Sequence, residues 1–110
     1  MKITVQDNKL LIFKRNRIVL LPLEKLLFIE RFNQKTYVHT FNEEIVLTNS
    51  LKSLQSILPN NFLKAHRSFI INKNLICELK AINDRTYEAI FEVDKQALVS
   101  KDYMNKIFAS

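Results

Sequence analysis

The side chains that could do chemistry in this chain are cations gathered in segments that look like turns. Each cluster combines cations with amide or hydroxyl groups that lie in it or next to it. Ammonium and guanidinium groups bind phosphate oxygens, and amide and guanidinium groups also pair with base edges. The pattern therefore favours contact with nucleic acid. The runs are Lys14–Arg17, Arg31–Thr36 and Lys64–Arg67, with single cations at Lys73 and Lys101.

The overall charge points the same way. The chain of 110 residues holds 17 Lys and Arg against 11 Asp and Glu, a formal charge of +6 at pH 7. Such an excess on a small body favours an anionic partner, either nucleic acid or an acidic membrane surface. Taken with the placement of the cations, it favours nucleic acid.

The groups needed for catalysis or for a bound cofactor form no pattern. His39, His66, Cys77 and the scattered carboxylates lack the spacing of a catalytic motif. His39 alternates with aromatic neighbours, so we expect a packed structural histidine, and we expect Cys77 to be buried. One Cys and two His cannot complete a four-ligand zinc site, and a chain without Gly has no phosphate-cradling loop. We expect no enzyme activity, cofactor or metal.

The length and hydropathy of the chain limit how many domains it can form and where it can reside. A chain of 110 residues is expected to form a single domain, residues 1–110. No apolar run approaches the roughly 20 residues that cross a bilayer, and the N-terminus lacks the apolar stretch of a signal peptide. The single Cys fits a reducing compartment. These features predict a cytoplasmic domain without membrane insertion.

The elements between the turns are predicted to be mainly β. Asn and Asp recur about every nine to twelve residues, and Asn can take the positive φ that Gly would supply in hairpins. The residues between are β-branched or aromatic, which indicates about ten short strands, with an irregular segment around His66. The expected strands are 3–5, 9–13, 18–21, 26–32, 36–41, 44–47, 69–71, 76–82, 86–93 and 97–99.

Two segments have helical spacing instead. The first runs from Ser50 to Leu58, where Pro59 ends it. The second begins at Ser100 and should pack Tyr103, Met104, Ile107 and Phe108 on the sheets. The strands at 10–13 and 18–21 are apolar on both faces, which predicts either burial on both sides or an interaction surface.

The run His66–Ile76, HRSFIINKNLI, resembles the signature of the LytTR family, the DNA-binding output domains of bacterial response regulators of the AlgR, AgrA and LytR type. The flanks are similar too: LPLEKLLFIE at 21–30 to the opening strand pair, 51–58 to the helix, LPNNF at 58–62 to the turn after it, and ALVSKDY at 97–103 to the closing strand. The resemblance covers residues 17–108 in order.

What the resemblance implies is a fold of three small, mostly antiparallel, stacked sheets with few helices. It further implies a bacterial transcriptional regulator that reads direct repeats in promoter DNA through loop side chains in successive major grooves and bends the duplex. The partner that the resemblance implies is double-stranded promoter DNA. A second copy of the domain on tandem repeats, or an inhibitory protein, is a possible further partner, and the sequence does not decide between them.

Carried over by position, the resemblance assigns DNA contact to three segments, 33–36, Arg67 and Lys101. Arg67 can bind guanine O6 and N7 bidentately, and Lys101 would meet a phosphate or a guanine at the start of the last helix. Asp102 departs from the family pattern, in which many relatives carry a second basic residue. In the first segment the residues are Asn33, Gln34, Lys35 and Thr36, with Lys35 or Thr36 at the groove.

Other residues are expected to support these contacts. Four cations are available for backbone phosphates. His66 is expected to anchor its segment through a backbone hydrogen bond, with DNA contact as the second option, and Asn72 and Asn74 are expected to be turn residues with unusual φ. The four cations are Arg31, Lys52, Lys64 and Lys73.

Two other functions compete with duplex binding. A module for single-stranded nucleic acid would stack bases on aromatic side chains along an open, basic sheet face. A protein-interaction or sensory domain would use the apolar strands near the N-terminus as a dimer face or partner groove. The second function could coexist with DNA binding.

Overall fold

The computed structural model describes residues 2–108, which form three antiparallel sheets. The first sheet contains β1 (Lys2–Gln6), β2 (Lys9–Phe13) and β3 (Ile18–Pro22). The middle sheet has the order β6 (Glu44–Leu47), β5 (Lys35–Thr40), β4 (Leu26–Phe32), β8 (Phe69–Asn72) and β7 (Phe62–His66). The third has the order β11 (Gln96–Ser100), β10 (Thr86–Ile90) and β9 (Glu78–Ala81). The predicted mainly β fold is confirmed.

Short helices complete the described chain. The two α-helices are α1 (Leu51–Gln55) and α2 (Met104–Phe108), and the 3-10 turns are η1 (Leu23–Lys25), η2 (Lys73–Leu75) and η3 (Lys101–Tyr103). The start of the helix predicted over Ser50 to Leu58 is confirmed, because the Ser50 hydroxyl caps α1 by accepting from the N–H of Ser53 at 3.1 Å. The predicted end is wrong, because α1 ends at Gln55, before Pro59. The predicted apolar face of the last helix is confirmed at Ile107, which is buried, but is wrong at Phe108, which is 53% exposed.

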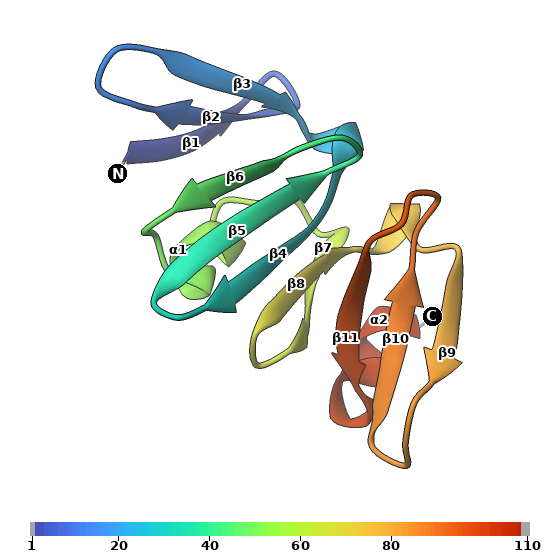
Figure 1. Cartoon of the computed structure of the whole chain (residues 1–110). Coiled ribbons are helices and arrows are strands. Elements are labelled where there is room, and N and C mark those ends of the chain that lie inside the picture. The colour runs from blue at the N-terminus through green and yellow to red at the C-terminus, as the bar shows by residue number, and fades with distance from the viewer. Residues whose placement is uncertain (1, 109–110) are drawn as a thin grey trace.

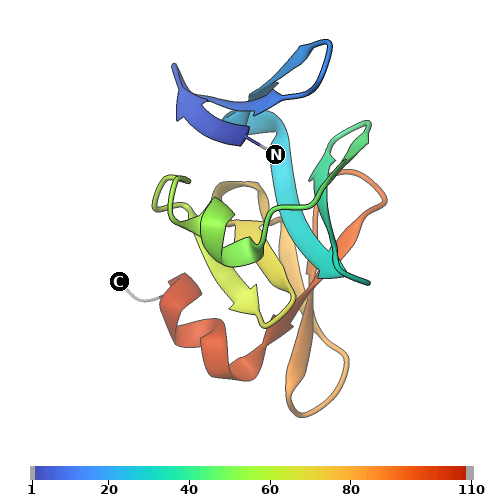
Figure 2. The same ribbon diagram turned by 90° about the vertical axis from the view of Figure 1, so that its left-hand side faces the viewer.

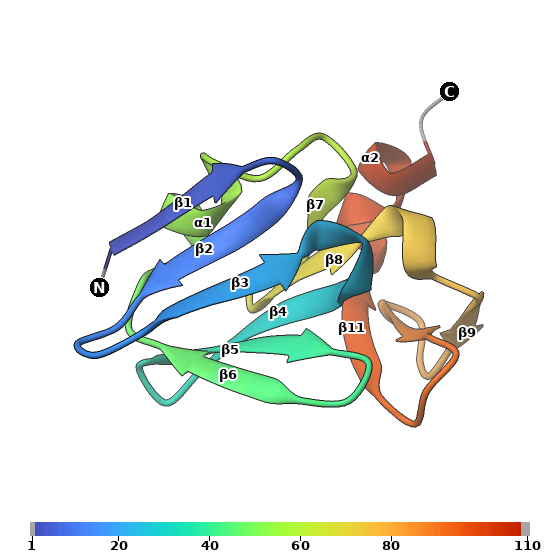
Figure 3. The same ribbon diagram turned by 90° about the horizontal axis from the view of Figure 1, so that it is seen from above.

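The middle sheet lies between the other two sheets (Figures 1 and 3). One of its faces joins β2, β3 and α1 in a core that includes Leu10, Ile29 and Leu54. The opposite face joins the third sheet and α2 in a second core that includes Phe28 and Val99. The middle sheet therefore contributes to both cores and is packed on both faces.

Two hairpins turn on pairs of residues with positive φ. Asp7 and Asn8 between β1 and β2 have φ of 52° and 60°, and Asn33 and Gln34 between β4 and β5 have φ of 51° and 64°. Positive φ at both central positions is the pattern of type I′ turns, which match the twist of paired strands. The prediction that Asn replaces Gly in such turns is therefore confirmed.

The strand β7 was missed, because the residues at its end were expected to be irregular. Phe62 faces one core, and Leu63 and Ala65 face the other. Because both faces carry apolar residues, the strand lacks the alternation of apolar and polar residues that would have revealed it. Its pairing with β8 shifts register between Lys64 and His66. Asn72 also differs from its expected turn role: its φ is −78°. Its buried amide donates to the carbonyl oxygen of Leu26 at 2.9 Å.

The apolar strands near the N-terminus divide their side chains between the core and the surface. Leu10, Ile12 and Leu21 are buried in the first core. Ile18 and Leu20 on β3 are 52% and 56% exposed. Within the described residues, no helix has the length and apolar character needed to span a membrane.

Candidate nucleic-acid interface

Three turns from distant parts of the chain lie along the lower border of the molecule in Figure 1. They are the β4–β5 turn, the β7–β8 turn and the junction of β11 with η3. The quarter-turn view in Figure 2 places the same turns in the lower half of the molecule. Each carries an exposed cation, namely Lys35, Arg67 and Lys101. The segments expected to contact bases are thus on one side of the molecule.

In the β4–β5 turn, the structure separates residues that face solvent from one that does not. Asn33, Gln34 and Lys35 are exposed. Thr36 is fully buried, and its hydroxyl donates a hydrogen bond to the carbonyl oxygen of Asn49. The prediction of Thr36 as a residue at the groove is therefore wrong, because its side chain is committed inside the protein. Lys35 is the cation that this turn presents.

Arg31 is bound internally instead of projecting toward a phosphate as predicted. Its Nη1 donates to the Thr36 hydroxyl at 2.8 Å and to the carbonyl oxygens of Thr48 and Asn49, each at 3.2 Å. The side chain is half-buried between the β4–β5 hairpin and the segment leading into α1. These contacts assign it a structural position within the interface.

His66 anchors the β7–β8 turn as predicted. Its Nδ1 accepts a hydrogen bond from the N–H of Ser68 at 3.1 Å, and its ring stands edge-on to Phe69 with centroids 5.7 Å apart. An accepting Nδ1 carries no proton, and burial together with the charge of Arg67 lowers the pKa of His66. Arg67 is exposed at the tip, and within residues 2–108 it takes part in no ion pair.

At the junction of β11 and η3, the N–H of Lys101 donates to the carbonyl oxygen of Arg85 at 2.9 Å. Arg85 lies in the β9–β10 turn and is exposed, as are Lys101 and Asp102. Sequence reasoning missed Arg85, although the run Asn83-Asp84-Arg85 has the same mixture of turn residues and cation as the other clusters. The structure therefore adds a fourth cation to this side.

The three lysines predicted to contact phosphates have different positions. Lys52 is exposed in α1, whose preceding residues bind Arg31. Lys64 is half-buried on β7, in the strand that leads to Arg67. Lys73 is exposed in η2, at the opposite end of β8 from the Arg67 turn. The structure does not bring Lys73 together with the others.

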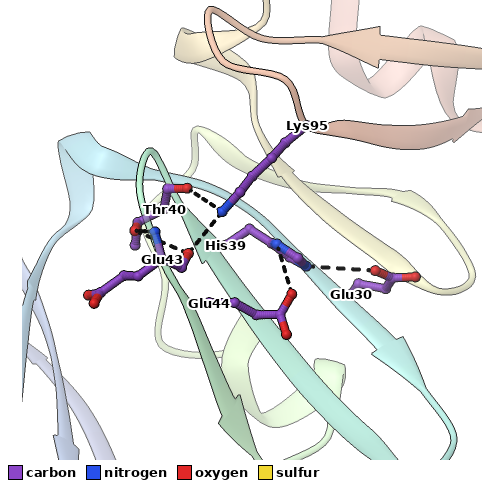
Figure 4. Close-up of polar contacts among 6 residues, drawn as sticks. All are labelled: Glu30, His39, Thr40, Glu43, Glu44 and Lys95. Carbon is purple, nitrogen blue, oxygen red and sulfur yellow. Dashed lines mark hydrogen bonds and ion pairs between the residues drawn. The ribbon is translucent and has the colours of Figure 1, made fainter.

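His39 is a packed structural histidine, as predicted (Figure 4). Its ring stacks on Phe28 with centroids 4.4 Å apart, between carboxylate oxygens of Glu30 and Glu44 at 3.7 and 3.6 Å. Burial lowers the pKa of His39, Glu44 opposes this shift, and Lys95 adds to it. Burial and the charge of Glu44 also raise the pKa of Glu30.

Lys95 joins the third sheet to the middle sheet near this histidine. Its Nζ donates to the carbonyl oxygens of Thr40 at 2.8 Å and Glu43 at 3.0 Å (Figure 4). Cys77, expected to be buried, is exposed, and it directly precedes β9, most of which is exposed as well. Within residues 2–108, no group of three or more His, Cys, Asp or Glu side chains is placed to hold a metal ion.

A stack of small antiparallel sheets that presents basic turns on one side defines a β-sheet domain suited to an anionic partner. The chain belongs to the LytTr DNA-binding domain family, whose sequence profile matches residues 16–110, close to the expected 17–108. The fold agrees with that of a LytTr DNA-binding domain from Bacillus cereus, with a TM-score of 0.81 and 23% identity, over 96% of this chain and all of that one.

Longer bacterial proteins contain similar sequences. The chain is 31% identical to the sensory transduction protein LytT of Bacillus cereus over 96% of this chain and 43% of LytT. It is 29% identical to the transcriptional regulatory protein NatR of Bacillus subtilis, over 93% of this chain and 45% of NatR. It matches the transcriptional regulatory protein YpdB of Escherichia coli at 29% identity, over 77% of this chain and 35% of YpdB. The chain thus spans less than half the length of these relatives.

The single-stranded alternative is not favoured. Stacking of successive bases needs several aromatic rings on one open face. Phe28, Phe69 and Phe91 are instead buried in the second core, where the Phe28 ring lies 5.4 Å from that of Phe91. Phe32, which is 59% exposed at the end of β4, is the one aromatic residue beside the β4–β5 turn with more than half its surface exposed.

Proposed function

We propose that this domain binds double-stranded promoter DNA in a sequence-specific manner, as the output domain of a bacterial transcriptional regulator. The observation that carries the proposal is that three turns far apart in the sequence lie along one side of the molecule (Figure 1), and that these turns carry the exposed cations Lys35, Arg67 and Lys101. Side chains on turns held by a rigid sheet can enter successive major grooves without a recognition helix. Membership of the LytTr DNA-binding domain family supports the same function.

In the proposed interface, different side chains have different tasks. The guanidinium group of Arg67 reads guanine O6 and N7, and Lys35 and Lys101 contact bases or phosphates at the neighbouring grooves. The amides of Asn33 and Gln34 offer both donors and acceptors to base edges. Lys52, Lys64 and Arg85 contact backbone phosphates, and these contacts do not depend on the DNA sequence. His66 acts through the position it gives Arg67.

The biological setting is proposed from the same family. We propose that residues 1–110 act as one binding domain in the cytoplasm, that two copies occupy direct repeats, and that binding rather than catalysis is its activity. The names of the relatives LytT and NatR, a sensory transduction protein and a transcriptional regulatory protein, support a role in signal-dependent transcription. An inhibitory partner protein would be a further means of control, for which exposed Ile18 and Leu20 offer an apolar contact.

The proposal is tested by selecting bound duplexes from a random pool and sequencing them. We expect two spaced direct repeats. A pool without a reproducible motif would contradict sequence-specific binding. Competition of the selected duplex with its separated strands tests the single-stranded alternative, in which the single strand would compete better.

A salt titration tests the electrostatic part. If about five phosphates are neutralised, the slope of log affinity against log salt concentration should be near −4.5. A slope close to zero would reject the basic side as the binding surface.

A further inference from the structure

Arg31 lies between the two turns that carry Lys35 and Arg67. Its strand, β4, is paired with β5 on one side and β8 on the other. Its register partner on β5 is Thr36, directly after Lys35. On the other side, its backbone N–H donates to the carbonyl oxygen of Ser68 at 2.9 Å, directly after Arg67. Arg31 therefore contacts the base of both turns.

The guanidinium group of Arg31 also binds a third segment, residues 48–49. We call this set of contacts, from Arg31 to Thr36, Ser68, Thr48 and Asn49, the Arg31 joint. Its Nη1 has three acceptors within 3.2 Å, the Thr36 hydroxyl and the carbonyl oxygens of Thr48 and Asn49. An Nη1 group has two hydrogens, so one of them is shared between two acceptors. The Thr36 hydroxyl itself donates to the carbonyl oxygen of Asn49, which closes the network. Ser50, the cap of α1, follows immediately.

We propose that Arg31 is a positioning residue that sets the distance and orientation between the Lys35 turn and the Arg67 turn. This inference rests on the proposed function. Base readout requires both turns to meet their base edges at once, whereas contact with phosphates tolerates displacement. A loosened joint should therefore lower discrimination between sequences and leave sequence-independent binding almost unchanged.

Two variants break the joint in independent ways. Arg31→Met keeps most of the apolar stem and removes the donors. Thr36→Val keeps the shape of the side chain, removes the buried hydroxyl and leaves the net charge unchanged. The matched control is Arg15→Met, which removes the same charge from the exposed β2–β3 turn, on the opposite border of Figure 1.

The measurement is the affinity of each variant for the selected duplex and for a scrambled duplex, over a series of salt concentrations. We expect Arg31→Met and Thr36→Val to lower the ratio of the two affinities about five- to tenfold, the scale of one weakened base contact. The salt slope should stay as in the wild type, since no phosphate contact is lost. Arg15→Met should leave the ratio unchanged.

Two results would overturn the inference. One is an equal loss on both duplexes in Arg31→Met with a salt slope smaller by about 0.9, the signature of a phosphate contact. The other is an unchanged ratio in Thr36→Val. Thermal unfolding checks that each variant folds. If Arg31→Met does not fold, the result for Thr36→Val alone decides whether the inference holds. If the wild-type domain shows no sequence preference, the proposed function is overturned. If the wild type has a sequence preference that depends on Arg67 but not on Arg31 or Thr36, only this inference is overturned.

Discussion

The β2–β3 turn and the β7–β8 turn both present arginine to solvent, but they differ in how they are held. Lys14–Arg17 form the first, which is closed by a hydrogen bond within the turn from the N–H of Lys14 to the carbonyl oxygen of Arg17, at 2.8 Å. The second is fixed from within by His66 and from outside by Arg31. Figure 1 shows the two turns on opposite borders of the molecule. The two turns thus carry similar charge but differ in support and in position.

The physical difference is preorganisation. A guanidinium group on a turn without outside contacts can bind a phosphate, but it must lose conformational freedom to reach one base edge. A turn already bound to β4 and to its own histidine has lost that freedom on folding. This difference supports the proposal that the β7–β8 turn, and not the β2–β3 turn, reads bases.

The largest effect is expected from removing the arginine of each turn. Arg67→Ala should weaken binding to the selected duplex by about 1–3 kcal/mol and relax discrimination at one or two base pairs. Arg15→Ala removes the same charge and should have a small effect that is equal on all sequences. Equilibrium binding to the selected and scrambled duplexes measures both. Equal losses on both duplexes for Arg67→Ala would contradict its role in base reading.

A smaller effect is expected from protonating the histidine that holds the Arg67 turn. The pKa of His66 lies below its usual 6.5, so the unfolded chain binds more protons than the folded domain as the pH falls below that value. His66 thus favours the folded turn above about pH 6.5, and this contribution is lost on acidification. Protonation of Nδ1 also removes the acceptor for Ser68. We expect the ratio of specific to scrambled binding to fall about two- to tenfold once the pH is low enough, below 6.5, to protonate His66 in the folded domain. This range is the scale of one hydrogen bond.

The control for this prediction is His66→Asn. The side-chain oxygen of Asn can accept from the backbone two residues on and does not titrate in this range. The variant keeps His39, whose pKa burial also lowers, so any remaining change with pH reports on His39. A wild-type ratio that does not fall as the pH is lowered from above 6.5 until the domain unfolds would contradict the role of His66.

The sequence predicted the elements better than it predicted which side chains the turns expose. The mainly β fold, the capped helix at Ser50 and the Asn-based turns followed from local signals, which act over a few residues. The strand β7 was missed because it buries apolar residues on both faces and so lacks the alternation of apolar and polar residues that marks a half-buried strand. The exposure of Cys77 was missed because most of β9, which follows it, is itself exposed.

At the candidate interface, too, the sequence predicted the turns but not which of their side chains are exposed. A cation next to an amide or hydroxyl side chain identifies a turn that could bind DNA, as at Lys35 beside Gln34 and Arg67 beside Ser68. Whether a side chain faces solvent depends on residues distant in sequence: Thr36 is buried by its contact with Asn49, and Arg31 binds Thr48. No local pattern around residue 31 contains that information.

The two type I′ hairpins allow the comparison to be repeated with matched glycine substitutions. Gln34 has a φ of 64°, and this left-handed backbone conformation destabilises a non-glycine residue by about 1–2 kcal/mol. Gly would relieve this strain, but it loses more conformational entropy on folding, which offsets part of the gain. Gln34→Gly should stabilise the domain by about 0.5–1 kcal/mol and weaken binding to the selected duplex. Asp7→Gly, at φ 52°, should stabilise by a similar or smaller amount without affecting binding. Thermal unfolding and duplex affinity measure the two effects.

These paired variants separate backbone strain from recognition. No gain in stability for Gln34→Gly would contradict strain at that position. Unchanged DNA affinity would remove the Gln34 amide from the interface and leave Lys35 as the contact from this turn.

The smallest effect is expected at single phosphate contacts. Lys64 precedes the Arg67 turn on β7, whereas Lys73 lies beyond the far end of β8. Lys64→Ala should therefore weaken all sequences alike and reduce the salt slope by about 0.9, and Lys73→Ala should leave the slope unchanged. Both variants lose one positive charge, so the net charge of the domain cannot account for a difference between them. Equal slopes for the two variants would mean that proximity to the Arg67 turn does not determine which cations meet the DNA backbone.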